Sequence, residues 1–152
     1  MILALSSLFR YNLKTPEQSV PLAKELKVVA DYMYLQQMRF GERIRYELDC
    51  KARQELVMVP AFTFQPLVEN AIIHGIAPKE EGGSIRIVVR QKENRLRIAI
   101  GDDGIGMTDE ELQQLKNRLK TTDAGHGGIG LGNVYRRITA MYPDGDFEIC
   151  SK

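Results

Sequence analysis

The chain has 152 residues, of which 43% are hydrophobic, and a formal net charge of +1. This length fits one domain with a sizeable core. The balance of 21 basic and 20 acidic residues gives no bulk attraction to nucleic acid, so we expect no nucleic-acid partner. Cys50 and Cys150 are too few for a metal knuckle, and we expect free thiols in a reducing cytoplasm.

Amphipathic helices are expected at the start of the chain. The apolar opening Met1–Leu5 is far shorter than the roughly 20 residues of a membrane span and lacks the basic segment of a signal peptide. Apolar spacing predicts a helix over residues 3–13. Thr15–Pro16 fits the start of a second helix, which we expect to run to Phe40 and to stop at Gly41.

Alternation of period two predicts strands in the rest of the chain, and apolar spacing near 3.6 predicts helices. The expected elements are a strand at 44–48, a helix at 60–73 ending at Gly75, a hairpin of strands at 85–89 and 96–100 joined at 92–95, a helix with a capping box of Thr108 and Glu111, a loop at 121–128, a helix at 130–142 and a strand at 147–149. Pro66 lacks a backbone donor, so it should kink or split its helix. Helices with an antiparallel hairpin, and no regular βαβ alternation, predict an α+β layer sandwich.

The segment Leu67–Gly75 places polar side chains on an otherwise apolar helix. Asn70 and His74 are four residues apart and therefore share one helical face. One interpretation is a buried amide bonded to backbone and a surface histidine. The other is that the carbonyl oxygen of Asn70 binds Mg²⁺, an ion that prefers oxygen ligands and completes its shell with water and phosphate.

The segment Asp102–Met107 begins with an acid that follows an apolar strand. Gly104 and Gly106 have no side chains, so the backbone can approach a flat ligand closely. The Asp102 carboxylate can accept a hydrogen bond from the exocyclic amine of adenine, where guanine presents a carbonyl oxygen. Such a bond contributes about 1.5–3 kcal/mol, or roughly 10- to 150-fold in affinity. The alternative is an ordinary turn.

The segment Gly125–Gly132 is rich in glycine and precedes a predicted helix. It contains the spacing G-x-G-x-x-G, but no strand comes directly before it, which excludes a Rossmann fingerprint. The chain also has no P-loop motif. The N–H groups of this segment and of the helix N-terminus can bind phosphate. A plain flexible loop is the alternative.

Taken together, the three segments resemble the N, G1 and G2 boxes of the GHKL superfamily, which includes histidine kinases and gyrase-type, chaperone-type and mismatch-repair ATPases. Phe64–Gly75, Tyr34–Phe40 and Gly128–Val134 are similar more specifically to LytS-type sensor histidine kinases. The resemblance implies a two-layer α/β sandwich with a mixed, mostly antiparallel sheet, helices on one face, and additional N-terminal helices. It also implies that residues 1–40 are a remnant of a helical dimerisation and acceptor region, and that residues 41–152 are a C-terminally truncated ATP-binding domain.

The same resemblance implies a nucleotide site that uses ATP and Mg²⁺. Asn70 would bind the metal ion, Asp102 would bind adenine, and a lid would extend from about Lys116 to Gly128. The other nucleotide-binding residues implied are His74, Gly104, Ile105, Gly106, Met107, Gly128, Ile129, Gly130 and Leu131. Ile105 and Met107 would line the adenine pocket. No residue is assigned a catalytic role.

The activity implied is transfer of the ATP γ-phosphoryl group to a histidine in a two-component system. Hydrolysing members of the superfamily carry a glutamate base where this chain has Pro66, so we expect transfer rather than efficient hydrolysis. His74 and His126, the only histidines, lie in ATP-site motifs, so the acceptor is expected outside the chain, which should not phosphorylate itself. Expected partners are the acceptor region of the same protein, a response regulator and a second copy of the intact kinase. The domain is expected to be cytoplasmic and the intact protein membrane-anchored. The first alternative is a GHKL ATPase or a protein-serine kinase of the anti-sigma type, and the second is an ATP sensor without chemistry.

Overall fold

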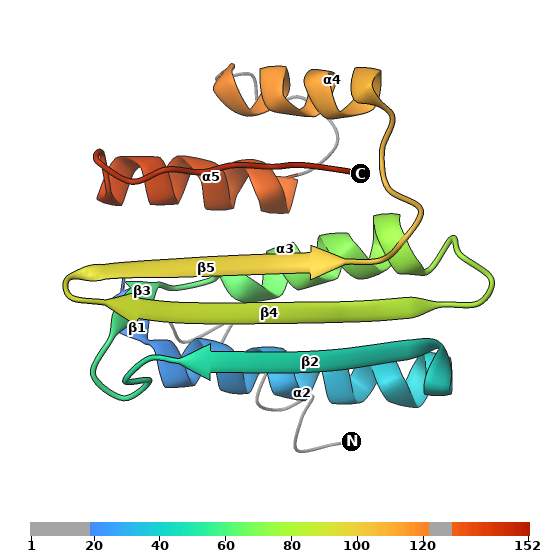
Figure 1. The fold of residues 1–152 in the computed structure, drawn as a ribbon, viewed down its shortest axis with the longest axis horizontal. Coiled ribbons are helices and arrows are strands. Elements are labelled where there is room, and N and C mark those ends of the chain that lie inside the picture. The colour runs from blue at the N-terminus through green and yellow to red at the C-terminus, as the bar shows by residue number, and fades with distance from the viewer. Residues whose placement is uncertain (1–18, 122–128) are drawn as a thin grey trace.

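The computed structural model describes residues 19–121 and 129–152, which form a sheet with helices packed on it and beside it (Figure 1). The helices are α2 (Leu22–Phe40), the 3-10 turn η1 (Gly41–Arg43), α3 (Phe64–Asn70), the π-helix η2 (Ala71–Ile76), α4 (Asp109–Lys120) and α5 (Ile129–Met141). The strands are β1 (Ser19–Pro21), β2 (Ile44–Lys51), β3 (Met58–Pro60), β4 (Gly83–Lys92) and β5 (Arg95–Asp102). The helix predicted at residues 3–13 and the Thr15–Pro16 cap lie outside the described residues.

The main sheet has the strand order β2-β4-β5, with β2 parallel to β4 and β4 antiparallel to β5. The predicted hairpin is confirmed, and Ile87 lies opposite Ile100. Along β4 the buried Ile85 and Ile87 alternate with the exposed Arg86, so one face of the sheet is apolar. Residues of α2, α3 and η2 cover this face and form the core with it. The predicted α+β sandwich with a mixed sheet is confirmed.

Residues 19–21 form a strand, whereas the sequence predicted that they belong to the second helix. Val20 pairs with Val59 of β3 in a small antiparallel sheet. Pro21 explains the boundary, because a residue before proline prefers extended backbone and proline has no N–H to donate inside a helix. The first amide of α2, that of Leu22, donates instead to the Val57 carbonyl at 2.8 Å.

Pro66 neither kinks nor splits its helix, which corrects the prediction. The helix begins at Phe64 rather than Pro60, so Pro66 lies in the first turn, where backbone N–H groups have no partner within the helix. The missing donor therefore costs no hydrogen bond. The irregularity comes later, where η2 continues past Gly75 and the Ala77 N–H donates to the Ile72 carbonyl at 2.8 Å. Such π-helical turns are frequent at functional sites.

Residues 147–149 do not form the predicted strand. Phe147 packs edge-on against Tyr135 of α5, with 5.3 Å between the ring centroids. Among the described strands β5 pairs only with β4, so residues 147–149 have no strand beside them. A strand requires such a neighbour because its backbone donors and acceptors must be paired.

Two smaller predictions, the capping box of α4 and the free cysteines, are confirmed. The Thr108 hydroxyl accepts the Glu111 N–H at 3.2 Å, and the Glu111 carboxylate accepts the Thr108 N–H at 2.7 Å, which completes the capping box of α4. Cys50 and Cys150 are free. None of the helices in the described ranges combines the length and the apolar character needed to cross a membrane.

We expect alkaline pH to destabilise the chain partly through Tyr32. Burial, with a smaller contribution from the charge of Glu69, raises the pKa of Tyr32 to about 12. Because an unfolded tyrosine titrates near 10, the folded state retains more protons between these values. The stability contributed by the neutral phenol is therefore complete below pH 10 and is lost as the pH rises towards 12.

Urea unfolding at a series of alkaline pH values measures this effect. Tyr32→Phe should show a shallower loss of unfolding free energy above pH 10 than the parent. The exposed Tyr142, changed to phenylalanine, serves as the control and should follow the parent curve. Identical slopes for Tyr32→Phe and Tyr142→Phe would contradict the expectation.

Candidate nucleotide-binding site

The π-helix η2 and the end of β5 fit together through two glycines. Gly75 is buried, and a Cβ added there would lie 2.5 Å from the Oδ1 atom of Asp102. Gly104 packs so closely that a Cβ on it would overlap the Gly75 backbone. The Ile105 N–H also donates to the Gly75 carbonyl at 2.9 Å. Two of the three motif segments are therefore in direct contact, and the Asp102 carboxylate lies beside the π-helix that continues from Asn70.

The exposed Asp102 has one carboxylate oxygen engaged by the protein. Its Oδ1 accepts the Gly104 N–H at 2.9 Å. Its Oδ2 has no hydrogen-bond partner in the described part of the chain. A carboxylate held in this way by one oxygen can still accept a donor from a ligand with the other.

The neighbouring Asp103 has a different role, which sequence reasoning missed. Its Oδ1 accepts the Ser84 N–H at 2.6 Å, and its carbonyl accepts Lys79 Nζ at 2.9 Å. A Cβ on Gly83 would collide with the same Asp103 carboxylate. Asp103 therefore ties the end of β5 to the start of β4 and positions Asp102. The alternation of side chains along a strand was the signal that could have separated the two acids.

The residues after Gly104 form an open turn. Gly106 has φ +70°, a left-handed conformation that favours glycine. The Met107 N–H donates to Ser151 Oγ at 2.9 Å, and the Met107 side chain is half-buried. Ile105 is 61% exposed. An isoleucine this exposed beside Asp102 offers an apolar surface for a flat ring.

Asn70 and His74 lie in different surroundings. Asn70 ends α3, is half-buried, and makes no side-chain hydrogen bond within residues 19–121 and 129–152. His74 lies in η2 and is exposed. A π-helix begins directly after Asn70, and the shared face predicted from the four-residue spacing stays a prediction. Asn70 nevertheless has a free amide oxygen to offer.

A metal ion at Asn70 would take most of its ligands from outside the protein. In the part of the chain that the structure describes, no three His, Cys, Asp or Glu side chains are grouped to hold a metal. The amide oxygen of Asn70 is a ligand type that fits Mg²⁺, which usually keeps several waters and binds substrate phosphates rather than an all-protein cage.

The third motif segment lies partly in a helix. Ile129, Gly130 and Leu131 form the first turn of α5 rather than a loop, and Leu131 is buried. Gly128 and the rest of residues 122–128 lie outside the described residues. Residues 116–120 of the expected lid belong to α4. The first N–H groups of a helix lack partners within the helix, which suits them to phosphate.

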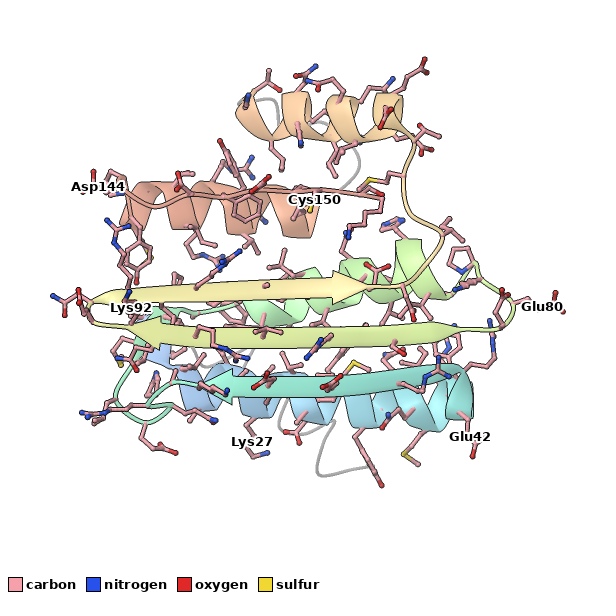
Figure 2. All side chains as sticks on the ribbon, viewed as in Figure 1. Lys27, Glu42, Glu80, Lys92, Asp144 and Cys150 are labelled. Atoms are coloured by element: carbon pink, nitrogen blue, oxygen red, sulfur yellow. The ribbon has the colours of Figure 1, made fainter. Side chains whose placement is uncertain are left out.

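The segment α3–η2 connects the two ends of this site. A Cβ on Gly130 of α5 would lie 3.3 Å from the Pro66 Cβ of α3, and Gly75 at the far end contacts Asp102. In Figure 2, Glu80 lies in the turn after η2, at the end of the sheet where β5 finishes, and Lys92 marks the opposite, hairpin end. The candidate site therefore occupies one end of the sheet.

Residues 61–152 match the family described as histidine kinase-, DNA gyrase B- and HSP90-like ATPase. The chain belongs to this family. A second family, histidine kinase, matches residues 1–44. The resemblance to LytS-type sensor histidine kinases is confirmed, and membership implies that this ATPase-family domain uses ATP.

The sensor histidine kinase YpdA of Escherichia coli is 34% identical to this chain over 95% of the chain and 25% of its own length. The sensor protein LytS of Enterococcus faecalis is 33% identical over 93% of the chain and 24% of its own length. The chain therefore spans about a quarter of the length of these relatives.

Two solved structures have a fold similar to that of this chain. The blue-light activated histidine kinase of Erythrobacter litoralis has a TM-score of 0.51 and 17% identity, with 93% of this chain and 46% of that chain covered. A bacterial phosphotransferase has a TM-score of 0.54 and 13% identity, with 91% of this chain and 62% of that chain covered.

Proposed function

We propose that this chain is the ATP-binding catalytic part of a two-component sensor histidine kinase. It would transfer the γ-phosphoryl group of ATP to a histidine supplied by another segment of the intact kinase. The observation that carries the proposal is the contact of Gly75 with Asp102 and Gly104. This contact places a carboxylate with one free oxygen beside the π-helix that continues from Asn70.

Each part of the site has a role in this proposal. The free Oδ2 of Asp102 accepts a hydrogen bond from the adenine amine, and Ile105 and Met107 pack against the ring. Gly104 and Gly106 leave room for it. The first turn of α5, with Ile129, Gly130 and Leu131, lies near the phosphates together with His74, and Gly128 is a further phosphate-binding residue that we propose from the sequence alone. Asn70 would hold Mg²⁺, and the bound ion would neutralise part of the negative charge of the phosphates.

Pro66 favours transfer over hydrolysis. It occupies the position from which a glutamate base acts in hydrolysing relatives, and it packs instead against Gly130. Glu69 is exposed and points about 100° away from its neighbour Asn70 on the helix. Phosphoryl transfer needs mainly positioning and charge neutralisation, and the acceptor histidine itself is the nucleophile. A response regulator and a second kinase copy are the further partners we propose.

Incubation of the full chain with γ-labelled ATP and a separate acceptor-helix domain tests the proposal. We expect label on a histidine of the added domain and none on the chain alone. Steady release of phosphate without labelled histidine would instead indicate an ATPase, and ATP binding without either product would indicate a sensor.

We expect Asn70→Ala to abolish the Mg²⁺-dependent part of ATP binding. Removal of the amide oxygen takes away the protein ligand that this position offers to the ion. The affinity for ATP in the presence of Mg²⁺ should therefore fall about 10-fold or more, to the affinity measured when a chelator removes Mg²⁺. Calorimetry with and without Mg²⁺ measures the difference. Asn94→Ala, in the exposed β4–β5 turn, is the matched control. Unchanged Mg²⁺ dependence in Asn70→Ala would remove Asn70 from the site.

A further inference from the structure

The turn at residues 61–64, which leads from β3 into α3, is held by a buried acid from another helix. Glu25 of α2 is only 1% exposed. Its carboxylate accepts the N–H groups of Phe62, Thr63 and Phe64, each at 3.0 Å. These are charge-assisted bonds to amides at the start of α3 that have no partner within the helix. Glu25 therefore determines where α3 begins.

A cation from a third helix holds the carbonyl side of the same turn. The guanidinium of Arg137 in α5 donates to the carbonyls of Ala61 and Phe62 and lies 5.8 Å from the centre of the Phe62 ring. Phe62 has φ +60°, a left-handed conformation that costs a non-glycine residue free energy. A turn with this conformation persists only because its surroundings hold it.

The two charged side chains depend on each other through the turn. Burial raises the pKa of the Glu25 carboxyl, whereas the amides of residues 62–64 and the charge of Arg137 lower it. A buried carboxylate is tolerated when donors and an opposite charge compensate its lost hydration. Removal of either charged group therefore weakens the support of the other.

Three functional segments meet at this turn. It starts α3, which ends at Asn70, and it contacts α5, whose first turn contains Gly130 and Leu131. It also contacts α2, within residues 1–44 that match the histidine kinase family. A change in the position of α2 would therefore reach both helices of the candidate nucleotide site.

We propose that Glu25 and Arg137 are positioning residues that hold α3 and α5 in the arrangement that binds nucleotide and that couple this arrangement to α2. The inference rests on the proposed ATP site and adds to it a route of regulation from the N-terminal helix. Neither side chain is proposed to touch ATP.

Glu25→Gln keeps the size of the side chain but places an NH₂ group among three backbone donors. We expect ATP affinity to fall about 10-fold, because only a fraction of folded molecules would keep the turn in its binding arrangement. Arg137→Gln should weaken binding similarly, and Arg137→Lys, which keeps the charge, should lie closer to the parent. The variant that combines Glu25→Gln and Arg137→Gln should lose less ATP affinity than the sum of the two single losses, since both substitutions act on one turn.

Calorimetry at a temperature where every variant is folded separates an effect on ATP affinity from an effect on the stability of the fold. Val89→Ala creates a cavity in the core near the hairpin end of the sheet and should lower the melting temperature without changing affinity. Arg136→Gln, the adjacent exposed arginine, is the charge control. ATP affinity like that of the parent in both Glu25→Gln and Arg137→Gln would overturn the inference. A loss of ATP affinity in Val89→Ala equal to the loss in these two variants would overturn it as well.

Hydrogen exchange on the unaltered full chain gives an independent test that needs no variant to fold. Because coupling is reciprocal, ATP should slow exchange of the Phe62, Thr63 and Phe64 amides. No change at these amides while ATP is bound would refute the coupling alone. If the unaltered chain failed to bind ATP at all, the proposed function would fail first and this inference with it.

Discussion

Asp102→Asn is expected to lower ATP affinity by about 10- to 150-fold, the value of one charge-assisted hydrogen bond. The reason lies in how the carboxylate is held. Oδ1 accepts the Gly104 N–H at 2.9 Å, so an asparagine should place its carbonyl oxygen there. Its NH₂ group then occupies the position of Oδ2, where a donor would face the donor of adenine.

The same geometry predicts a change in base preference. An NH₂ group at the position of Oδ2 can donate to the carbonyl oxygen of guanine, so Asp102→Asn should bind GTP better relative to ATP than the parent does. Competition calorimetry with both nucleotides measures this ratio. Asp109→Asn, an exposed acid in the first turn of α4, makes the same chemical change away from β5. An unaltered ATP-to-GTP ratio in Asp102→Asn would show that this residue does not read the base.

Gly104→Ala is expected to lower ATP affinity by about 100-fold, close to 2.7 kcal/mol. Its Cβ would overlap the Gly75 backbone, so β5 and η2 would have to separate. Separation would also lengthen the hydrogen bond from the Ile105 N–H to the Gly75 carbonyl, now 2.9 Å. Overpacking of this kind costs about 1–3 kcal/mol of stability as well.

Gly101→Ala is the matched control, because a Cβ at Gly101 meets nothing within 4 Å. The same methyl group is thus added three positions earlier in the chain, without the clash. Titration of both variants with ATP, together with their thermal unfolding, makes the comparison. Strong binding by Gly104→Ala, or an equal loss in Gly101→Ala, would show that the contact of Gly104 with Gly75 does not shape the site.

Local sequence predicted those elements whose partners are close in the chain. The β4–β5 hairpin and the capping box of Thr108 and Glu111 are confirmed. The innermost hairpin pair, Lys92 and Arg95, and the capping box each join residues three positions apart, and the remaining hairpin pairs extend from that turn. The predictions for two short segments are wrong. Residues 19–21 are a strand because Val59 lies beside them, and residues 147–149 are not a strand because no described strand does.

For the candidate site too, the sequence predicted one part and the tertiary structure decided the other. The sequence alone determined the types of group at the site: an amide at Asn70, an acid at Asp102, and glycines between and after them. The order of these groups along the chain also determined the family. Only the tertiary structure decided that Gly75 and Gly104 touch, that Asp102 keeps one oxygen free, and that Glu25 holds the start of α3. The contacts of Gly75 with Gly104 and of Glu25 with the start of α3 join residues far apart in the chain, and close packing, which no local pattern encodes, brings them together.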